Sequence, residues 1–190
     1  LDVEAVDWVG ISMGGLIGMA LASMEKTPVR RLVVSDVGPE ITIGSIQRIA
    51  SYVGTDPRWT SFDEAMAYIR VVSAPFGKLG DEQWRHLTEH CVRQDADGGW
   101  RFRYDPKVAE PFKAAFSGEP IDLWPFYERI VCPTLVVRGA ESDLLTRETW
   151  EQMGKRGPRA KLVEIPEVGH APMFLTDEQI AVARDFLLAP

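Results

Sequence analysis

The stretch Gly10-Ile11-Ser12-Met13-Gly14 decides how the rest of the chain is interpreted. It follows residues 5–9, which are mostly apolar and favour a buried strand. It precedes residues 16–22, an uninterrupted run rich in helix-forming residues. A serine in a G-x-S-x-G pattern between a strand and a helix is typical of a sharp turn that exposes a nucleophilic hydroxyl. We therefore predict that Ser12 is a nucleophile.

The glycines of this stretch have a predicted role of their own. Gly10 and Gly14 have no Cβ, so the strand and the helix can approach each other closely. The N-terminus of the helix then faces any negative charge that develops beside Ser12. The alternative interpretation is a glycine-rich turn that only packs a helix on a sheet. A base and an acid elsewhere in the chain are needed to decide between the two.

The composition is that of an ordinary globular protein, with 190 residues of which 45% are hydrophobic and 26% are charged. A net charge of −7 and a pI near 5.0 give no support for binding to nucleic acid or to an anionic membrane. No apolar run approaches the roughly 20 residues of a membrane span. Cys91 and Cys132 lie in separate segments and form no disulfide framework. We therefore expect a cytoplasmic protein.

The order of the predicted elements divides the chain into a core and an insertion. Residues 31–37 form a β-branched run after the first helix, and strand, helix and strand then make a βαβ unit with parallel strands. Residues 40–120 contain several short helical patterns, and we predict that they form an inserted helical cap. The fold class is therefore α/β: a mostly parallel sheet with flanking helices, formed by residues 1–39 and 121–190.

Three side chains that suit acyl transfer lie just after predicted strands. Ser12, Asp143 and His170 follow the apolar strands at 5–9, 132–138 and 161–166. Because the C-terminal ends of parallel strands share one edge of a sheet, these side chains can converge there. Serine needs a base to take its proton, and histidine suits that role near neutral pH. A carboxylate on the other ring nitrogen fixes the tautomer and stabilises the imidazolium.

The choice of the acid has an alternative. Asp36 also ends a predicted strand, and we favour Asp143 over it. Glu141 is interpreted as a solvated loop carboxylate, and the alternative for His170 is a histidine on a surface loop. The substitution Asp143→Asn is expected to reduce turnover by orders of magnitude through the wrong tautomer. Near-normal activity of that variant would instead assign the role to Asp36.

The run His86-Leu87-Thr88-Glu89-His90 matches H-x-x-E-H, a zinc-protease signature. On a helix the two histidines share one face, but the sequence offers no distinctive third ligand. We interpret them as polar residues on the exposed face of a cap helix, and we expect neither a metal nor an organic cofactor. The aromatic residues of the insertion either line an apolar acyl pocket or form the core of the cap, and we favour the core: Trp59, Trp84, Trp100, Phe102 and Tyr104.

Several segments resemble α/β-hydrolase fold enzymes. Gly-Ile-Ser-Met-Gly-Gly, Arg-Gly-Ala-Glu-Ser-Asp-Leu-Leu and Val-Gly-His-Ala-Pro are similar to the nucleophile, acid and histidine segments of that family. Asp-Val-Gly-Pro-Glu at 36–40 is similar to the stretch where its cap domain begins. The order Ser…Asp…His is also that of the family. The resemblance implies Ser12 as nucleophile, Asp143 as acid and His170 as base, with the Met13 backbone N–H in the oxyanion hole.

The chain differs from the family pattern at its N-terminus. The earlier strands of that fold, and the His-Gly loop that gives the second oxyanion donor, normally precede the nucleophile strand. This chain starts at Leu1 and reaches its central motif almost at once. One missing donor costs about 10²–10³ in rate. We therefore expect a partial chain, partnered by a missing N-terminal segment of the same fold.

The resemblance implies a serine hydrolase that cleaves a small carboxylic ester or related acyl bond through an acyl-enzyme. Its partner in the reaction is a small-molecule acyl substrate. Carbon–carbon bond hydrolases and lactonases with the same triad are alternatives, as is a non-catalytic ligand receptor of the same fold. Because Ser12 is not an aspartate, the branches with a carboxylate nucleophile, the dehalogenases and epoxide hydrolases, are disfavoured.

Overall fold

The computed structural model describes residues 3–110 and 121–189. Residues 111–120, the last part of the predicted insertion, lie outside the described residues. The chain divides into two compact units. The first comprises Leu1–Thr42, Pro75–Gly77 and Pro120–Pro190, and the second comprises Ile43–Ala74 and Lys78–Glu119. The short segment Pro75–Gly77 therefore belongs to the first unit, although the sequence pattern groups it with the insertion.

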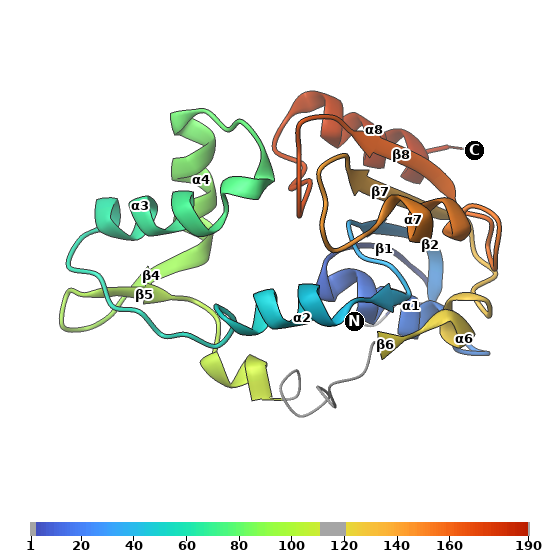
Figure 1. Cartoon of the computed structure of the whole chain (residues 1–190), viewed down its shortest axis with the longest axis horizontal. Coiled ribbons are helices and arrows are strands. Elements are labelled where there is room, and N and C mark those ends of the chain that lie inside the picture. The colour runs from blue at the N-terminus through green and yellow to red at the C-terminus, as the bar shows by residue number, and fades with distance from the viewer. Residues whose placement is uncertain (1–2, 111–120, 190) are drawn as a thin grey trace. The chain divides into compact units, whose positions relative to one another are not determined.

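A four-stranded sheet with the order β1-β2-β7-β8 forms the centre of the first unit (Figure 1). Its strands are β1 Val6–Ile11, β2 Val29–Ser35, β7 Thr134–Gly139 and β8 Lys161–Ile165. Every neighbouring pair is parallel. The predicted α/β class, with a mostly parallel sheet and flanking helices, is confirmed.

Helices cover both faces of this sheet because its central strands are apolar on both sides. Leu32 and Val34 of β2 lie against Gly18 and Gly15 of α1 (Met13–Ala22). Val33, which points to the opposite face, joins a buried cluster with strand β7 and with the partly buried residues of α8 (Asp177–Leu187). The helices α1 and α8 therefore lie on opposite faces of the sheet.

Close approach of β1 and α1 depends on Gly10, as the sequence predicts, but not on Gly14. A Cβ on Gly10 would lie 2.2 Å from the Gly14 carbonyl oxygen, which is far inside van der Waals contact. A Cβ on Gly14 would meet nothing within 4 Å. The helix positions that leave no room for a side chain are instead Gly15, where a Cβ would lie 2.6 Å from Val37, and Gly18, where it would lie 2.6 Å from the Trp8 ring of β1.

The register of the sheet aligns the ends of its strands. Ile11 pairs with Ser35, and Ser35 pairs with Val137. Two more backbone hydrogen bonds extend this row, from Ser12 N–H to the Ser35 oxygen (2.9 Å) and from Asp36 N–H to the Val137 oxygen (2.8 Å). Ser12 and Asp36 are therefore neighbours at the C-terminal edge of the sheet.

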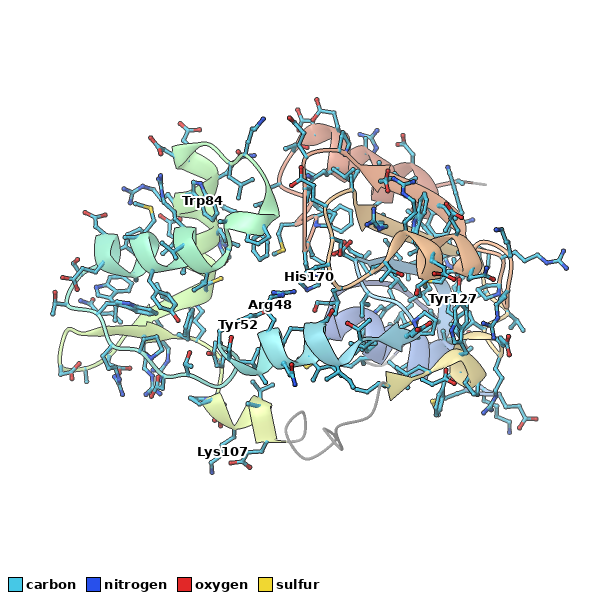
Figure 2. The ribbon with its side chains drawn as sticks, in the orientation of Figure 1. Arg48, Tyr52, Trp84, Lys107, Tyr127 and His170 are labelled. Atoms are coloured by element: carbon cyan, nitrogen blue, oxygen red, sulfur yellow. The ribbon has the colours of Figure 1, made fainter. Side chains whose placement is uncertain are left out.

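Shorter elements complete the first unit. β3 (Glu40–Ile41) pairs antiparallel with β6 (Ile121–Asp122). They are followed by α6 (Trp124–Tyr127) and α7 (Arg147–Met153). Tyr127 of α6, labelled in Figure 2, is fully buried. It links the two helices, since its hydroxyl donates to the Met153 carbonyl oxygen at 2.8 Å.

In the part of the second unit that the structure describes, short helices accompany a β-hairpin. They are α2 Ile43–Ala50, α3 Phe62–Val72, α4 Asp81–Cys91, the strands β4 Val92–Gln94 and β5 Trp100–Phe102, and the 3-10 turn η2 Pro106–Val108, with a further turn, η1 Ala74–Phe76, at the boundary of the units. Trp59 is 9% exposed and packs against the rings of Tyr68 and Phe102, with centroid distances of 5.3 and 5.1 Å. These rings give the unit a core of its own.

Candidate active site

Ser12 occupies a strained turn between β1 and α1. Its φ of 50° is in the left-handed region that residues with a side chain rarely adopt. The turn is held because the Ser12 carbonyl oxygen accepts from the N–H groups of Gly15 and Leu16, at 2.8 and 3.2 Å. The short run from a strand into a helix therefore fixes the direction of the Ser12 hydroxyl.

His170 lies on the loop after β8 and contacts this hydroxyl. Its Nε2 is 3.0 Å from Ser12 Oγ, and its side chain is 9% exposed. The loop is held from two sides, since Gly169 N–H donates to the Pro75 oxygen at 2.7 Å and Glu141 N–H donates to the Val168 oxygen at 2.9 Å. The base that the sequence predicts and the serine that it predicts are thus brought together.

The carboxylate on the other ring nitrogen belongs to Asp36. Asp36 Oδ2 lies 2.8 Å from His170 Nδ1, and the aspartate side chain is fully buried. Since a carboxylate accepts, Nδ1 carries the hydrogen, and Nε2 is left with the lone pair that can take the Ser12 proton. Ser12, His170 and Asp36 form a continuous line of hydrogen bonds.

Asp143, the favoured acid of the sequence analysis, lies exposed on the loop after β7. The carboxylate that the structure brings to His170 Nδ1 is instead that of Asp36, the alternative. The physical reason is the register, because Asp36 directly follows the row that also positions Ser12, and its φ of 53° turns the chain there. Glu141 is exposed, in keeping with a solvated carboxylate.

Asp36 is surrounded by hydrogen-bond donors. Gly139 N–H donates to Oδ1 at 2.7 Å, and the Ser142 hydroxyl donates to Oδ2 at 2.6 Å. Together with His170, three donors therefore compensate a carboxylate that has no contact with water. Ser142 lies within the acid segment quoted above, but sequence reasoning did not single it out. A serine one position from a candidate acid is too common a signal to be found without the fold.

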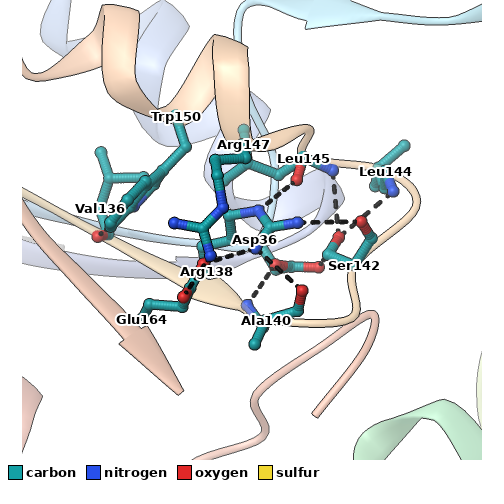
Figure 3. A network of polar contacts seen from close by, with 11 residues as sticks. Asp36, Val136, Arg138, Ala140, Ser142, Leu144, Leu145, Arg147, Trp150 and Glu164 are labelled. Carbon is teal, nitrogen blue, oxygen red and sulfur yellow. Dashed lines mark hydrogen bonds and ion pairs between the residues drawn. The ribbon is translucent and has the colours of Figure 1, made fainter. Parts of the chain in front are cut away.

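A buried arginine holds the loop that supplies these donors (Figure 3). Arg138 is 5% exposed and donates to the carbonyl oxygens of Leu145, Ala140 and Ser142 at 2.7, 3.1 and 3.3 Å. Its charge is balanced by Glu164 of β8, at 2.6 Å. The turn from Gly139 to Leu145 is therefore fixed from the inside of the unit.

Met13 is the first residue of α1, so its N–H has no acceptor within the helix. The residue is 54% exposed, and it is the backbone N–H that matters for an oxyanion. A donor beside the nucleophile, at the N-terminus of a helix, suits a developing negative charge. The role of Met13 in an oxyanion hole remains a prediction.

Other candidate groups do not form a second centre in the described part of the chain. No three His, Cys, Asp or Glu side chains gather there as a metal site would need. His86 and His90 lie on one face of α4 with ring centroids 4.4 Å apart, and His90 Nδ1 donates to the His86 carbonyl oxygen at 2.8 Å. Burial raises the pKa of both cysteine thiols, Cys91 and Cys132, which disfavours the reactive thiolate.

Comparison with known proteins shows the family to which the chain belongs. Residues 2–184 match the alpha/beta hydrolase family, and the chain belongs to that family. It is 47% identical over 194 residues to a 3-hydroxybutyrate-oligomer hydrolase of Cupriavidus necator, covering 98% of this chain and 66% of that protein. It is 28% identical over 170 residues to the esterase Rv0045c of Mycobacterium tuberculosis, covering 86% of this chain and 54% of that protein.

A solved structure extends this likeness to three dimensions. An α/β hydrolase of Novosphingobium aromaticivorans superposes with a TM-score of 0.85 at 32% identity, covering 97% of this chain and 66% of that one. The chain thus spans from about half to about two thirds of the length of these relatives. Among the described residues, no helix is long and apolar enough to cross a membrane.

Proposed function

We propose that this protein is a serine hydrolase that cleaves carboxylic esters through an acyl-enzyme, with Ser12 as nucleophile, His170 as base and Asp36 as acid. The observation that carries the proposal is the line of hydrogen bonds from Ser12 Oγ through the His170 ring to Asp36. Asp36 takes the place that the sequence analysis gave to Asp143.

The first half of the reaction forms the acyl-enzyme. Ser12 Oγ attacks the ester carbonyl carbon while His170 Nε2 takes the hydroxyl proton. The imidazolium that forms is stabilised by the Asp36 carboxylate on Nδ1. The negative charge on the former carbonyl oxygen faces the Met13 N–H. When the tetrahedral intermediate collapses, His170 gives its proton to the leaving alkoxide.

The second half releases the acid. A water molecule loses a proton to His170 Nε2 and attacks the Ser12 acyl group, and the proton returns to Ser12 Oγ when the second tetrahedral intermediate collapses. Each turnover therefore consumes one water and returns all three side chains to their starting states. Neither half requires a group from outside the protein other than substrate and water.

The relatives support a first choice of substrate class for this proposal. The proposal takes esters of 3-hydroxy acids as first candidates, since the relative at 47% identity is a 3-hydroxybutyrate-oligomer hydrolase. Such an oligomer is a chain of ester bonds, each with a secondary alkoxide as leaving group. Dimers and trimers of 3-hydroxybutyrate are therefore the substrates to compare with p-nitrophenyl esters of graded acyl length.

A fluorophosphonate probe with Ser12→Ala as control tests the proposal. We expect rapid labelling that maps to Ser12, and hydrolysis of at least one ester series that Ser12→Ala reduces at least about 10³-fold. Tight binding of an ester or acid without labelling would favour a ligand receptor instead. Activity that survives in Ser12→Ala would refute the proposed nucleophile.

A further inference from the structure

The hydroxyl group of Ser142, in the loop after β7, makes three hydrogen bonds that fix its direction. Ser142 Oγ accepts from the N–H groups of Leu144 and Leu145, at 3.2 and 3.1 Å. Both oxygen lone pairs are therefore occupied by donors, and the hydroxyl hydrogen points to the acceptor that the described residues offer, Asp36 Oδ2 at 2.6 Å. The direction of this hydrogen bond is thus set by the backbone of the loop.

The oxygen that receives this hydrogen is the one that faces the base. Asp36 Oδ2 accepts from both Ser142 and His170, whereas Oδ1 accepts from Gly139 N–H. If the carboxylate rotated, Gly139 and Ser142 would both lose their acceptor in a buried environment. The two protein donors therefore lock the plane of the carboxylate in the orientation that meets Nδ1.

We propose that Ser142 is a positioning residue for the hydrolytic reaction: its hydroxyl holds Asp36 so that Oδ2 accepts from His170. The inference rests on the proposed function, because it assigns a role within the same site. It extends that function from three side chains to four. The competing interpretation is that Ser142 only closes the turn between β7 and α7 through its two N–H contacts.

The side chain of Arg138 holds the backbone around Ser142. The guanidinium donates to the Ser142 carbonyl oxygen and to those of Ala140 and Leu145 on either side. The backbone of Ser142 is therefore fixed before and after the hydroxyl-bearing carbon (Figure 3). A rigid support of this kind is what a group needs if it is to orient a neighbouring catalytic side chain.

The test compares Ser142→Ala with two other variants. Ser142→Ala removes the donor to Asp36 together with the acceptor for the two N–H groups. Ser142→Thr keeps a hydroxyl in the same place. Thr146→Ala is the matched control, because Thr146 Oγ1 also accepts a backbone N–H, that of Thr149 at 3.1 Å, and starts α7. Among the described residues, the Asp36 carboxylate accepts from Gly139, Ser142 and His170, and not from Thr146.

We measure kcat, KM and the thermal midpoint for each variant with the best ester substrate. A charged hydrogen bond of this kind predicts that Ser142→Ala lowers kcat about 10-fold to 100-fold while KM stays within about 3-fold. Ser142→Thr is expected to recover most of kcat. Thr146→Ala is expected to lower the thermal midpoint with kcat within about 2-fold of the parent.

Two outcomes overturn the proposal while the proposed function stands. One is a Ser142→Ala variant that keeps the parent kcat, and the other is a loss in Ser142→Ala no larger than in Thr146→Ala at equal thermal midpoint. If Ser12→Ala retains full activity, the proposed function itself fails, and the positioning role of Ser142, which depends on that function, fails with it. The serine control thus separates the two failures.

Discussion

At the scale of single residues, the nucleophile and the carboxylate on the histidine share an unusual backbone conformation. Ser12 has a φ of 50° and Asp36 a φ of 53°, and neither is a glycine. Conformations of this kind cost about 1–3 kcal/mol each and persist only where the surroundings fix them. Both residues directly follow a strand end, so the same turn out of the sheet presents both side chains at one edge. The strain coincides with the proposed chemistry.

Substitution of the two candidate acids, Asp36 and Asp143, is expected to affect kcat very differently. In the proposed mechanism Asp36→Asn removes the charge that fixes the His170 tautomer, and kcat is expected to fall about 10³-fold to 10⁴-fold. Asp143→Asn is expected to keep kcat within about 10-fold of the parent. Steady-state kinetics with one ester substrate decides the matter. A reversed ranking would return the role to Asp143, as the sequence pattern alone suggests.

Two neighbouring glycines differ in what they tolerate. Gly10→Ala brings a methyl group to 2.2 Å from a backbone oxygen, which is expected to lower the free energy of unfolding by about 3 kcal/mol. Gly14→Ala places its methyl in open space within a helix and is expected to be neutral or stabilising, by up to about 1 kcal/mol. Urea denaturation measures both. Equal losses in the two variants would contradict the packing described for this turn.

At the scale of elements, the sheet follows closely from the sequence. The four apolar runs and the βαβ connection predict parallel strands, and the structure confirms the class. The acid was harder to predict because Asp36 and Asp143 both follow strands. Their difference depends on register, which aligns Ile11, Ser35 and Val137 in one row. Because β2 and β7 are buried on both faces, an alternation of apolar and polar residues that could specify the alignment is missing from them.

The roles of the turn residues escape sequence reasoning for a related reason. Ser142 and Arg138 act through backbone atoms of a loop whose path is not encoded by any repeating pattern. Gly14 was predicted to be needed for close approach, yet it lies on a side of the helix where a Cβ would meet nothing within 4 Å. Gly15, the next residue, faces the sheet. A rotation of one residue along a helix is about 100°, which is enough to exchange the two roles.

Packing between α6 and α7 predicts a dependence of stability on alkaline pH. Burial raises the pKa of the Tyr127 hydroxyl far above its ordinary value of about 10. This raised pKa contributes stability below pH of about 10 that is lost as pH rises further, because only the unfolded state then releases the proton. Tyr127→Phe removes the effect, at a cost of about 1 kcal/mol at neutral pH for the lost hydrogen bond to Met153.

Urea denaturation at pH 8 and at pH 10.5 measures this difference. The parent protein is expected to lose more stability between the two pH values than Tyr127→Phe does. The comparison at pH 8 serves as the control, since it reports the hydrogen bond alone. Equal losses of stability in both proteins would show that a group other than Tyr127 governs the loss of stability at alkaline pH.

At the scale of the whole molecule, the first unit is not continuous in sequence. It includes Pro75–Gly77, a segment whose flanking residues on both sides belong to the second unit. The Pro75 oxygen accepts from Gly169 N–H, next to His170. A Cβ on Gly169 would lie 3.1 Å from that oxygen and 3.2 Å from the Pro75 Cβ, so the loop of the base and this segment fit tightly.

Gly169→Ala tests whether this contact positions the base. The added methyl is expected to shift the His170 loop and to lower kcat about 10-fold or more, since small displacements of a catalytic group have large effects on rate. Gly44→Ala is the control, because a Cβ there meets nothing within 4 Å. Fluorophosphonate labelling rates give a second readout. Unchanged kinetics in Gly169→Ala would mean that the loop absorbs the methyl without moving His170.

The discontinuity at Pro75–Gly77 also bears on engineering by lid exchange. Transplanting residues 43–119 from a relative as a single segment would replace the helices of the second unit and also the Pro75 carbonyl group that accepts from Gly169 N–H. In a chimera built that way, the effect of the new second unit could not be separated from the effect of a displaced His170 ring. Two grafts, 43–74 and 78–119, with the native tripeptide left between them, would exchange the second unit and keep the contact that holds the His170 loop.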